Sequence, residues 1–151
     1  MPQDSFLQAF LSSSLGDQAR VILATALLIS VSVGFAIGSF SRIRHGLVRA
    51  STTLAPVVPG TPTAERVVSA VDVADRSLPG HRTCLMRSLT AETLLRLYAF
   101  TPEHRIGVTT ETTDGMKAHS WLELHDTVLI GDLENLSQYE PLPSLQMWEE
   151  I

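Results

Sequence analysis

A long segment without any charged side chain lies near the start of the chain, and it limits the folds that this sequence can adopt. Residues 21–40 are apolar apart from one threonine, three serines and two glycines. A helix rises about 1.5 Å per residue, so a segment of this length spans about 30 Å, the thickness of a bilayer's hydrocarbon core. The segment must therefore cross a membrane or be covered by other groups.

Both arrangements are consistent with the sequence. In a transmembrane helix the basic residues between 42 and 49 would follow the span, and the positive-inside rule would then keep the rest of the chain in the cytoplasm. Because glycines and hydroxyl side chains interrupt the hydrophobicity, one or two helices packed on the core or lying on a membrane surface are the alternative. A cleaved signal peptide is not expected, since Asp4 and Asp17 precede the segment and a basic start is lacking.

The remaining sequence predicts an α+β domain. The clearest linker, residues 57–62, divides a hydrophobic helical N-terminal region and linker (1–60) from a second domain (61–151). Fourteen of the sixteen acidic residues lie in the second domain, which argues against nucleic-acid binding. In this domain helical patterns come first and strand patterns follow, so we expect helices packed on an antiparallel sheet. The expected elements are a short helix near Ser5 to Leu11, a helix or loop around Ser41 to Arg49, helices from Pro62 to Leu78 and from Cys84 to about Phe100, a strand from Arg105 to Thr110, a turn at Asp114-Gly115, a hairpin of Lys117 to Leu124 with Thr127 to Gly131, and an irregular tail.

Cys84 is the only cysteine and stands where the second of these helices begins. It cannot form an internal disulfide, so its thiol either packs in the hydrophobic core or takes part in a reaction. Thr83 is a suitable N-cap, which places Cys84 in the first turn. There the free backbone N–H groups and the helix dipole favour thiolate over thiol and can hold an oxyanion.

The predicted hairpin contributes a histidine and an aspartate. Alternation puts His119 and Trp121 on one face of the first strand, with Ser120 on the other. If residues 125 and 126 form a two-residue turn, counting outward places His119 opposite Asp132, within reach of a hydrogen bond. Cysteine, histidine and aspartate in this order are the skeleton of a nucleophile with its base and its orienting residue.

These residues resemble a known family. The segments that carry the resemblance are Thr83-Cys84-Leu85-Met86-Arg87-Ser88-Leu89, Arg105-Ile106-Gly107-Val108, Ala118-His119-Ser120-Trp121-Leu122-Glu123 and the strand of Asp132. Over roughly residues 66–142 they are similar to the lasso-peptide leader peptidases, which have a transglutaminase-like (papain-like) cysteine peptidase core. One departure is Ser120, where the family more often has alanine.

The resemblance implies a function and partners. Cys84 matches the nucleophile, His119 the general base and Asp132 the residue that orients the histidine. The substrate would be a lasso-peptide precursor, whose leader is removed so that a separate cyclase can close the macrolactam. Because the chain shows no obvious room for a leader-recognition domain, a separate recognition protein would present the leader, and the cyclase is a further potential partner. We expect no cofactor and no metal. The resemblance favours packed N-terminal helices. The expected location is the cytoplasm, with membrane association through residues 21–40 as the alternative.

Other uses of the same residues remain open. A lone cysteine in an apolar helix is often core, and the chain would then be a non-enzymatic, membrane-anchored adaptor. Acyl transfer to an amine instead of water would need the same catalytic residues. His81 and Cys84 have zinc-ligand spacing, with His119 or His125 as further ligands, although the paired motifs of strong zinc sites are missing. The other two histidines, His45 and His104, are expected on the surface or in loops.

Overall fold

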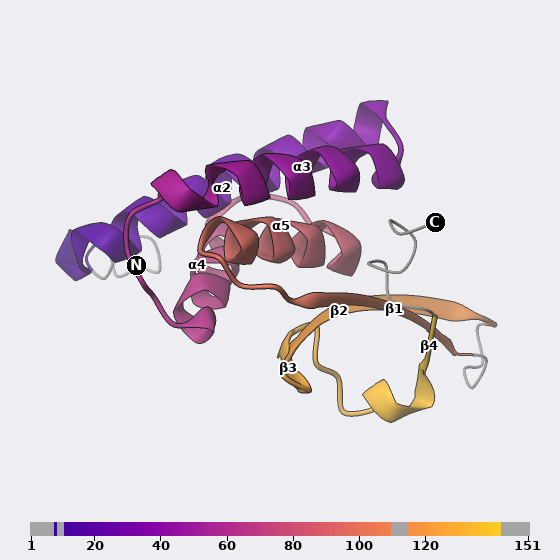
Figure 1. The fold of residues 1–151 in the computed structure, drawn as a ribbon. Helices are drawn as coiled ribbons and strands as arrows, with labels where there is room; N and C mark the ends of the chain where they lie inside the picture. Colours follow the sequence, from indigo (N-terminus) through magenta and orange to yellow (C-terminus); the bar gives the residue numbers. More distant parts are fainter. Residues whose placement is uncertain (1–7, 9–10, 110–114, 143–151) are drawn as a thin grey trace.

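The computed structural model describes residue 8, residues 11–109 and residues 115–142. Within these residues, helices α2, α3 and α5 lie on one side of a four-stranded antiparallel sheet, with α4 packed beside them (Figure 1). The strand order is β3-β2-β1-β4, so the predicted combination of helices and an antiparallel sheet is confirmed. The elements are α2 (Leu15–Ile37), α3 (Phe40–Leu54), η1 (Ala55–Val57), α4 (Ala64–Ser77), α5 (Cys84–Leu97), β1 (Glu103–Thr109), β2 (Lys117–Leu124), β3 (Thr127–Ile130), η2 (Leu136–Gln138) and β4 (Glu140–Pro141).

The uncharged segment forms most of α2, a helix of 23 residues that begins after the N-cap Ser14 and ends before Gly38. One face is buried by packing on α4 and α5, through Ala24, Leu28 and Val31. By length and hydropathy α2 could cross a membrane, a test that signal sequences and core helices also pass. The structure adds that part of this helix contributes directly to the protein core.

The hydrophobic core is continuous across the linker at residues 57–62. Side chains of α2 meet those of α4 and α5, and the sheet closes the other side. The fully buried contributors include Ala24, Leu28, Val67, Val71, Ala74, Leu94, Leu95 and Leu122. Helix α2 therefore shares one core with the residues that follow the linker.

Side-chain caps determine where α4 and α5 begin. The hydroxyl of Thr63 accepts a hydrogen bond from the Arg66 N–H at 3.3 Å, so α4 begins after Thr63 and not at Pro62. It ends at Ser77, before Leu78-Pro79-Gly80 as predicted. Helix α5 begins at Cys84 as predicted and stops at Leu97, slightly earlier than expected, because the chain turns through Ala99 with φ of 67°.

The strands extend or shorten the predicted ones by a few residues. β1 starts two residues early at Glu103, β2 agrees with the prediction, and β3 ends one residue early at Ile130. The tail was expected to be irregular, but β4 pairs with β1. The predicted helix near Ser5 to Leu11, the end of the strand at Thr110, Asp114 of the predicted turn and the last part of the tail lie wholly or mostly outside the described residues.

The hairpin of β2 and β3 contains both a confirmed and a corrected prediction. His125 and Asp126 have φ of 50° and 64°, values of a tight two-residue hairpin turn, and Leu124 pairs with Thr127 as predicted. A bulge then shifts the register, so that Leu122 pairs with Ile130. One extra residue in β3 moves every later residue by one position relative to β2. The prediction that His119 lies opposite Asp132 is therefore wrong.

Candidate active site

Cys84 is the first residue of α5 and lies partly exposed at the N-terminal end of this helix. The Thr83 hydroxyl accepts a hydrogen bond from the Met86 N–H at 3.2 Å, which satisfies one free N–H group of the first turn. The other N–H groups and the positive end of the helix dipole favour an anion here. The backbone at Cys84 can therefore stabilise a thiolate, or the oxyanion that forms when a thiolate attacks a carbonyl group.

The first turns of α5 lie against β2, the strand that carries His119. Ser88, one turn after Cys84, donates through its hydroxyl to the carbonyl oxygen of Ser120 at 3.2 Å. One turn further along α5, Glu92 binds His104 of β1. His104 pairs with Leu122, which lies two residues beyond Ser120 on β2. One turn of helix and two residues of strand each advance by about 6 Å. Helix α5 therefore runs alongside β2, and Cys84 lies one turn before the contact of Ser88 with Ser120.

The imidazole of His119 is held by one hydrogen bond and two rings. Its Nε2 lies 2.6 Å from the carbonyl oxygen of Gly131. Trp121 stacks beside it with ring centroids 6.1 Å apart, and Tyr139 lies at 5.6 Å on a tilted plane. Because a carbonyl oxygen only accepts, Nε2 carries a proton, and Nδ1 of the neutral ring is left free to accept one. The ring is therefore prepared to act as a base through Nδ1.

The Gly131 carbonyl oxygen, and not the Asp132 carboxylate, binds His119 in this structure. A Cβ atom on Gly131 would lie 2.7 Å from the Ser120 carbonyl oxygen, and φ is +88°, so the backbone here approaches β2 as only glycine allows. Where the backbone approaches β2 in this way, the Gly131 carbonyl oxygen lies within hydrogen-bond distance of His119. Asp132 follows directly and is exposed.

The three predicted site residues lie on α5, on β2 and directly after Gly131. Cys84 is one turn from a contact with β2, His119 lies on β2, and Asp132 is next to the group that binds His119. Among the residues that the structure describes, no hydrogen bond joins these three side chains to one another. Catalytic hydrogen bonds are often long or absent before substrate binds, so this geometry is compatible with a catalytic role.

A second polar group, which we call the buried ion-pair cluster, comprises Arg44, Glu92, Arg96, His104 and Ser120. Arg44 of α3 donates to both carboxylate oxygens of Glu92 on α5, at 2.6 and 3.2 Å, and Arg96 donates to one of them at 3.2 Å. His104 of β1 lies 2.7 Å from Glu92 through Nδ1 and 2.6 Å from the Ser120 hydroxyl through Nε2. The cluster connects α3, α5, β1 and β2.

Glu92 remains ionised although it is fully buried. Burial alone would raise the pKa of its carboxyl group, but the hydrogen bonds and charges of His104 and Arg44 outweigh it and lower the pKa to about 2. A buried charge with this many partners is satisfied, whereas removal of one partner would leave the others unpaired in the core.

The sequence prediction missed this cluster. His104 was expected on the surface or in a loop, but its side chain is fully buried, because β1 starts two residues earlier than predicted and turns it toward α5. A signal was present in the sequence: Glu92 and Arg96 stand four residues apart, and they form an ion pair on an otherwise apolar, central helix. A carboxylate in such a helix requires cationic or donor partners from other elements.

Ser120, His104 and Glu92 are connected in the same order as the nucleophile, base and acid of a serine hydrolase. All three are buried, with Ser120 only 2% exposed. A substrate carbonyl group cannot reach the Ser120 hydroxyl in this arrangement. The cluster is therefore structural, and Ser120 points away from His119 as the strand alternation predicts.

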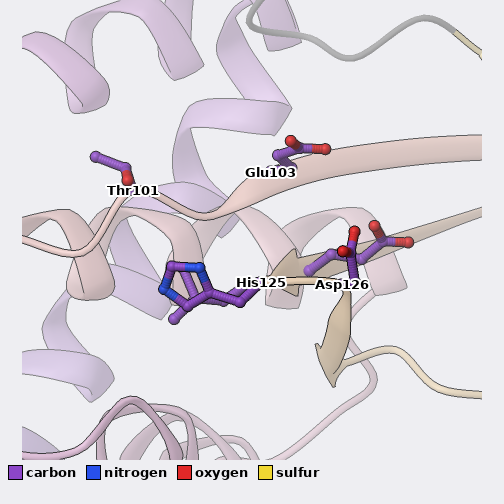
Figure 2. Close-up of a pocket in the computed structure, with 6 residues that line it drawn as sticks. Thr101, Glu103, His125 and Asp126 are labelled. Carbon is purple, nitrogen blue, oxygen red and sulfur yellow. The ribbon is translucent and has the colours of Figure 1, made fainter.

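A surface hollow of about 220 Å³ lies at the other end of the hairpin (Figure 2). Figure 2 shows Glu103 on β1 and His125 and Asp126 of the hairpin turn around it. It is six residues along β2 from His119 and takes no part in the candidate active site. Across the described residues no group of three or more His, Cys, Asp or Glu side chains could hold a metal ion, so the zinc alternative gains no support there.

Fold and site together define a class of protein: an α+β domain in which a cysteine starts the central helix beside a strand that carries a positioned histidine. The family model described as the transglutaminase-like superfamily matches residues 26–144, most of the chain. The protein therefore belongs to the transglutaminase-like superfamily, which includes cysteine peptidases and acyltransferases. Comparisons with curated proteins and with solved structures gave no match.

Proposed function

We propose that this protein is a cysteine peptidase that removes the leader from a lasso-peptide precursor, with Cys84 as nucleophile and His119 as base. The observation that carries the proposal is the position of Cys84 at the start of α5, tied to β2 one turn later by the Ser88–Ser120 hydrogen bond at 3.2 Å. Membership of the superfamily, which includes cysteine peptidases and acyltransferases, supports acyl chemistry at a cysteine. The substrate rests on the sequence resemblance of the segments around Cys84 and His119.

The reaction would proceed through an acyl-enzyme. The Cys84 thiolate attacks the scissile carbonyl carbon, and protonated His119 gives its proton to the leaving amine as the peptide bond breaks. The core peptide departs with a free amino group, while the leader stays on Cys84 as a thioester. His119 then takes a proton from water, the hydroxide attacks the thioester, and the leader leaves as a carboxylate with the thiolate restored.

The part of Asp132 in this scheme is to orient His119, as the resemblance implies. The Gly131 carbonyl already accepts from Nε2, so Asp132 would act on a ring whose tautomer the backbone has fixed. We further propose that a separate leader-recognition protein presents the substrate and that the cyclase takes up the product. A tethered leader raises the effective concentration of the scissile bond at a small domain such as this.

The experiment combines the full chain with a lasso precursor and its leader-recognition protein and follows leader release by mass spectrometry. Cys84→Ala should abolish release and leave binding to the recognition protein unchanged. His81→Ala is the matched control, because His81 is exposed and three residues from Cys84 in the sequence. Cleavage by Cys84→Ala would exclude the peptidase assignment, and loss in the control would instead support a His81–Cys84 metal site.

Two alternatives give different outcomes. An acyltransferase would form an amide with an added primary amine faster than it hydrolyses the thioester. A non-enzymatic adaptor would show the same Cys84 alkylation profile with and without His119.

A further inference from the structure

The outward side of α2 carries an apolar stripe that the protein does not cover. Its members recur at alternating spacings of four and three, the spacing of one helix face. They are Leu15, Ala19, Ile22, Ala26, Ile29 and Val33, and all are exposed, with Ile22 at 62% and Val33 at 55%. We call these six residues the outer stripe. The opposite side of α2 is already occupied, because it packs on α4 and α5.

The neighbouring helix α3 carries two arginines on its exposed side. Arg42 and Arg49 are seven residues apart, about two helical turns, and both are exposed. Arg44 instead turns inward and donates to Glu92. No acidic residue occurs between residues 18 and 64, although the whole chain has a formal charge of −5. The surface of α2 and α3 is thus basic and apolar in an acidic protein.

These two helices lie side by side and form the layer farthest from the sheet (Figure 1). We propose that the outer stripe of α2 and the exposed arginines of α3 bind the surface of an anionic lipid bilayer, with both helices parallel to the membrane plane. Apolar side chains would enter the boundary between headgroups and acyl chains, and the arginines would contact lipid phosphates. This inference is independent of the proposed peptidase function.

The contacts of α2 favour this arrangement over a membrane-spanning one. Ala24 and Leu28 are fully buried members of the core, and Arg20 is buried beside Tyr98, with its guanidinium carbon 5.9 Å from the ring centroid. Insertion of α2 across a bilayer would remove these side chains from the core and place the Arg20 charge near the start of the span. Surface binding uses only side chains that the fold leaves exposed.

Charge favours an anionic bilayer over a second copy of this chain as the occupant. A second copy would present the same arginines and no carboxylates from its own residues 18–64, so like charges would approach one another. Anionic headgroups neutralise them. An arginine close to such a surface changes binding roughly fivefold at moderate salt, so two of them account for more than about tenfold.

The test is flotation of the purified full chain with vesicles. One set contains phosphatidylcholine alone and the other contains phosphatidylglycerol as well. We expect binding to the second set only, weakened by added salt. Arg42→Glu with Arg49→Glu should reduce binding by more than about tenfold. Arg66→Glu with Arg76→Glu on α4 changes the same number of exposed charges and should have little effect.

A second pair of variants tests the outer stripe. Ile22→Ser with Ile29→Ser should abolish flotation while the circular dichroism spectrum stays unchanged, since both side chains are exposed. Three results would overturn the proposal. Equal binding to both vesicle sets that resists alkaline carbonate would mean that α2 spans the bilayer. A dimer in size-exclusion chromatography that the two serine substitutions dissociate, or a monomer, in either case without binding to vesicles, would mean that the outer stripe does not bind lipid. Cys84→Ala should bind like the wild type, so failure here is distinguishable from failure of the peptidase assignment.

Discussion

Helix α5 carries two polar groups that are built in opposite ways. At its middle, Glu92 lies in the buried ion-pair cluster, where each charged group has hydrogen-bonded partners. At its start, Cys84 is partly exposed, and the nearby His119 has a single hydrogen bond to a backbone carbonyl. The difference shows how a small domain separates two tasks. Buried charges whose hydrogen bonds are satisfied hold the helices to the sheet, whereas reactive groups have fewer hydrogen-bond partners and remain accessible to substrate.

The largest effect should come from the reactive group. His119→Ala should lower leader release by about 10²–10⁴-fold, the usual contribution of a general base. Its unfolding free energy should fall by only about 1 kcal/mol, the worth of one hydrogen bond. Leader release by mass spectrometry and urea denaturation give the two values. Full leader release by this variant would contradict the assignment.

The buried ion-pair cluster should respond in the reverse sense. Glu92→Gln removes the charge that Arg44 and His104 share, and the unfolding free energy should fall by about 3–5 kcal/mol. The matched control is Glu103→Gln, since Glu103 is half exposed and its pair with Arg105 should contribute less than about 1 kcal/mol. Urea denaturation of both variants is the measurement. Equal losses would mean that burial of the cluster does not determine its stability contribution.

Acid should weaken the buried ion-pair cluster. The pKa of Glu92 is about 2 in the folded chain, compared with its ordinary value of 4.5. Above pH 4.5 the stabilisation is fully present; as pH falls from 4.5 toward 2 the unfolded chain binds a proton more readily, so up to about 3 kcal/mol is lost. Unfolding free energies across this range should show the slope in the wild type. Glu92→Gln should remove it.

The smallest effect is expected at Asp132. Because the Gly131 carbonyl fixes the His119 tautomer, Asp132→Asn should lower leader release by less than about tenfold. A residue that alone fixes the tautomer of a catalytic histidine contributes about 10⁴-fold when replaced by its amide. Single-turnover cleavage measures the ratio directly. A loss close to the larger value would show that the aspartate takes over from the carbonyl in the substrate complex.

Local signals in the sequence were sufficient for much of the fold. The cap at Thr83, the helix that starts at Cys84 and the turn after Leu124 each depend on a few adjacent residues, and each was predicted. The pairing of Leu124 with Thr127 and of Glu123 with Val128 also follows from the two-residue turn alone. These features place Cys84 and the strand of His119 without knowledge of the tertiary structure.

The missed features depend on residues that are distant in sequence. Alternation alone reveals neither the bulge between Leu122 and Glu123 nor the close approach of the Gly131 backbone to β2. The burial of His104 depends on Arg44 and Glu92, which lie on two other elements. Strand β4 is two residues long and is defined by its partner β1. Tertiary contacts decide each of these cases.

The hydrogen bond of His119 to the Gly131 carbonyl has a consequence for how this protein can vary among its relatives. Every residue type carries a carbonyl oxygen, so a scan that replaces side chains one at a time will not detect this acceptor. An insertion or deletion of one residue between Thr127 and Gly131 would detect it, because it moves the oxygen along the strand. We therefore expect this segment to tolerate changes of residue type, except at Gly131, and to keep a fixed length.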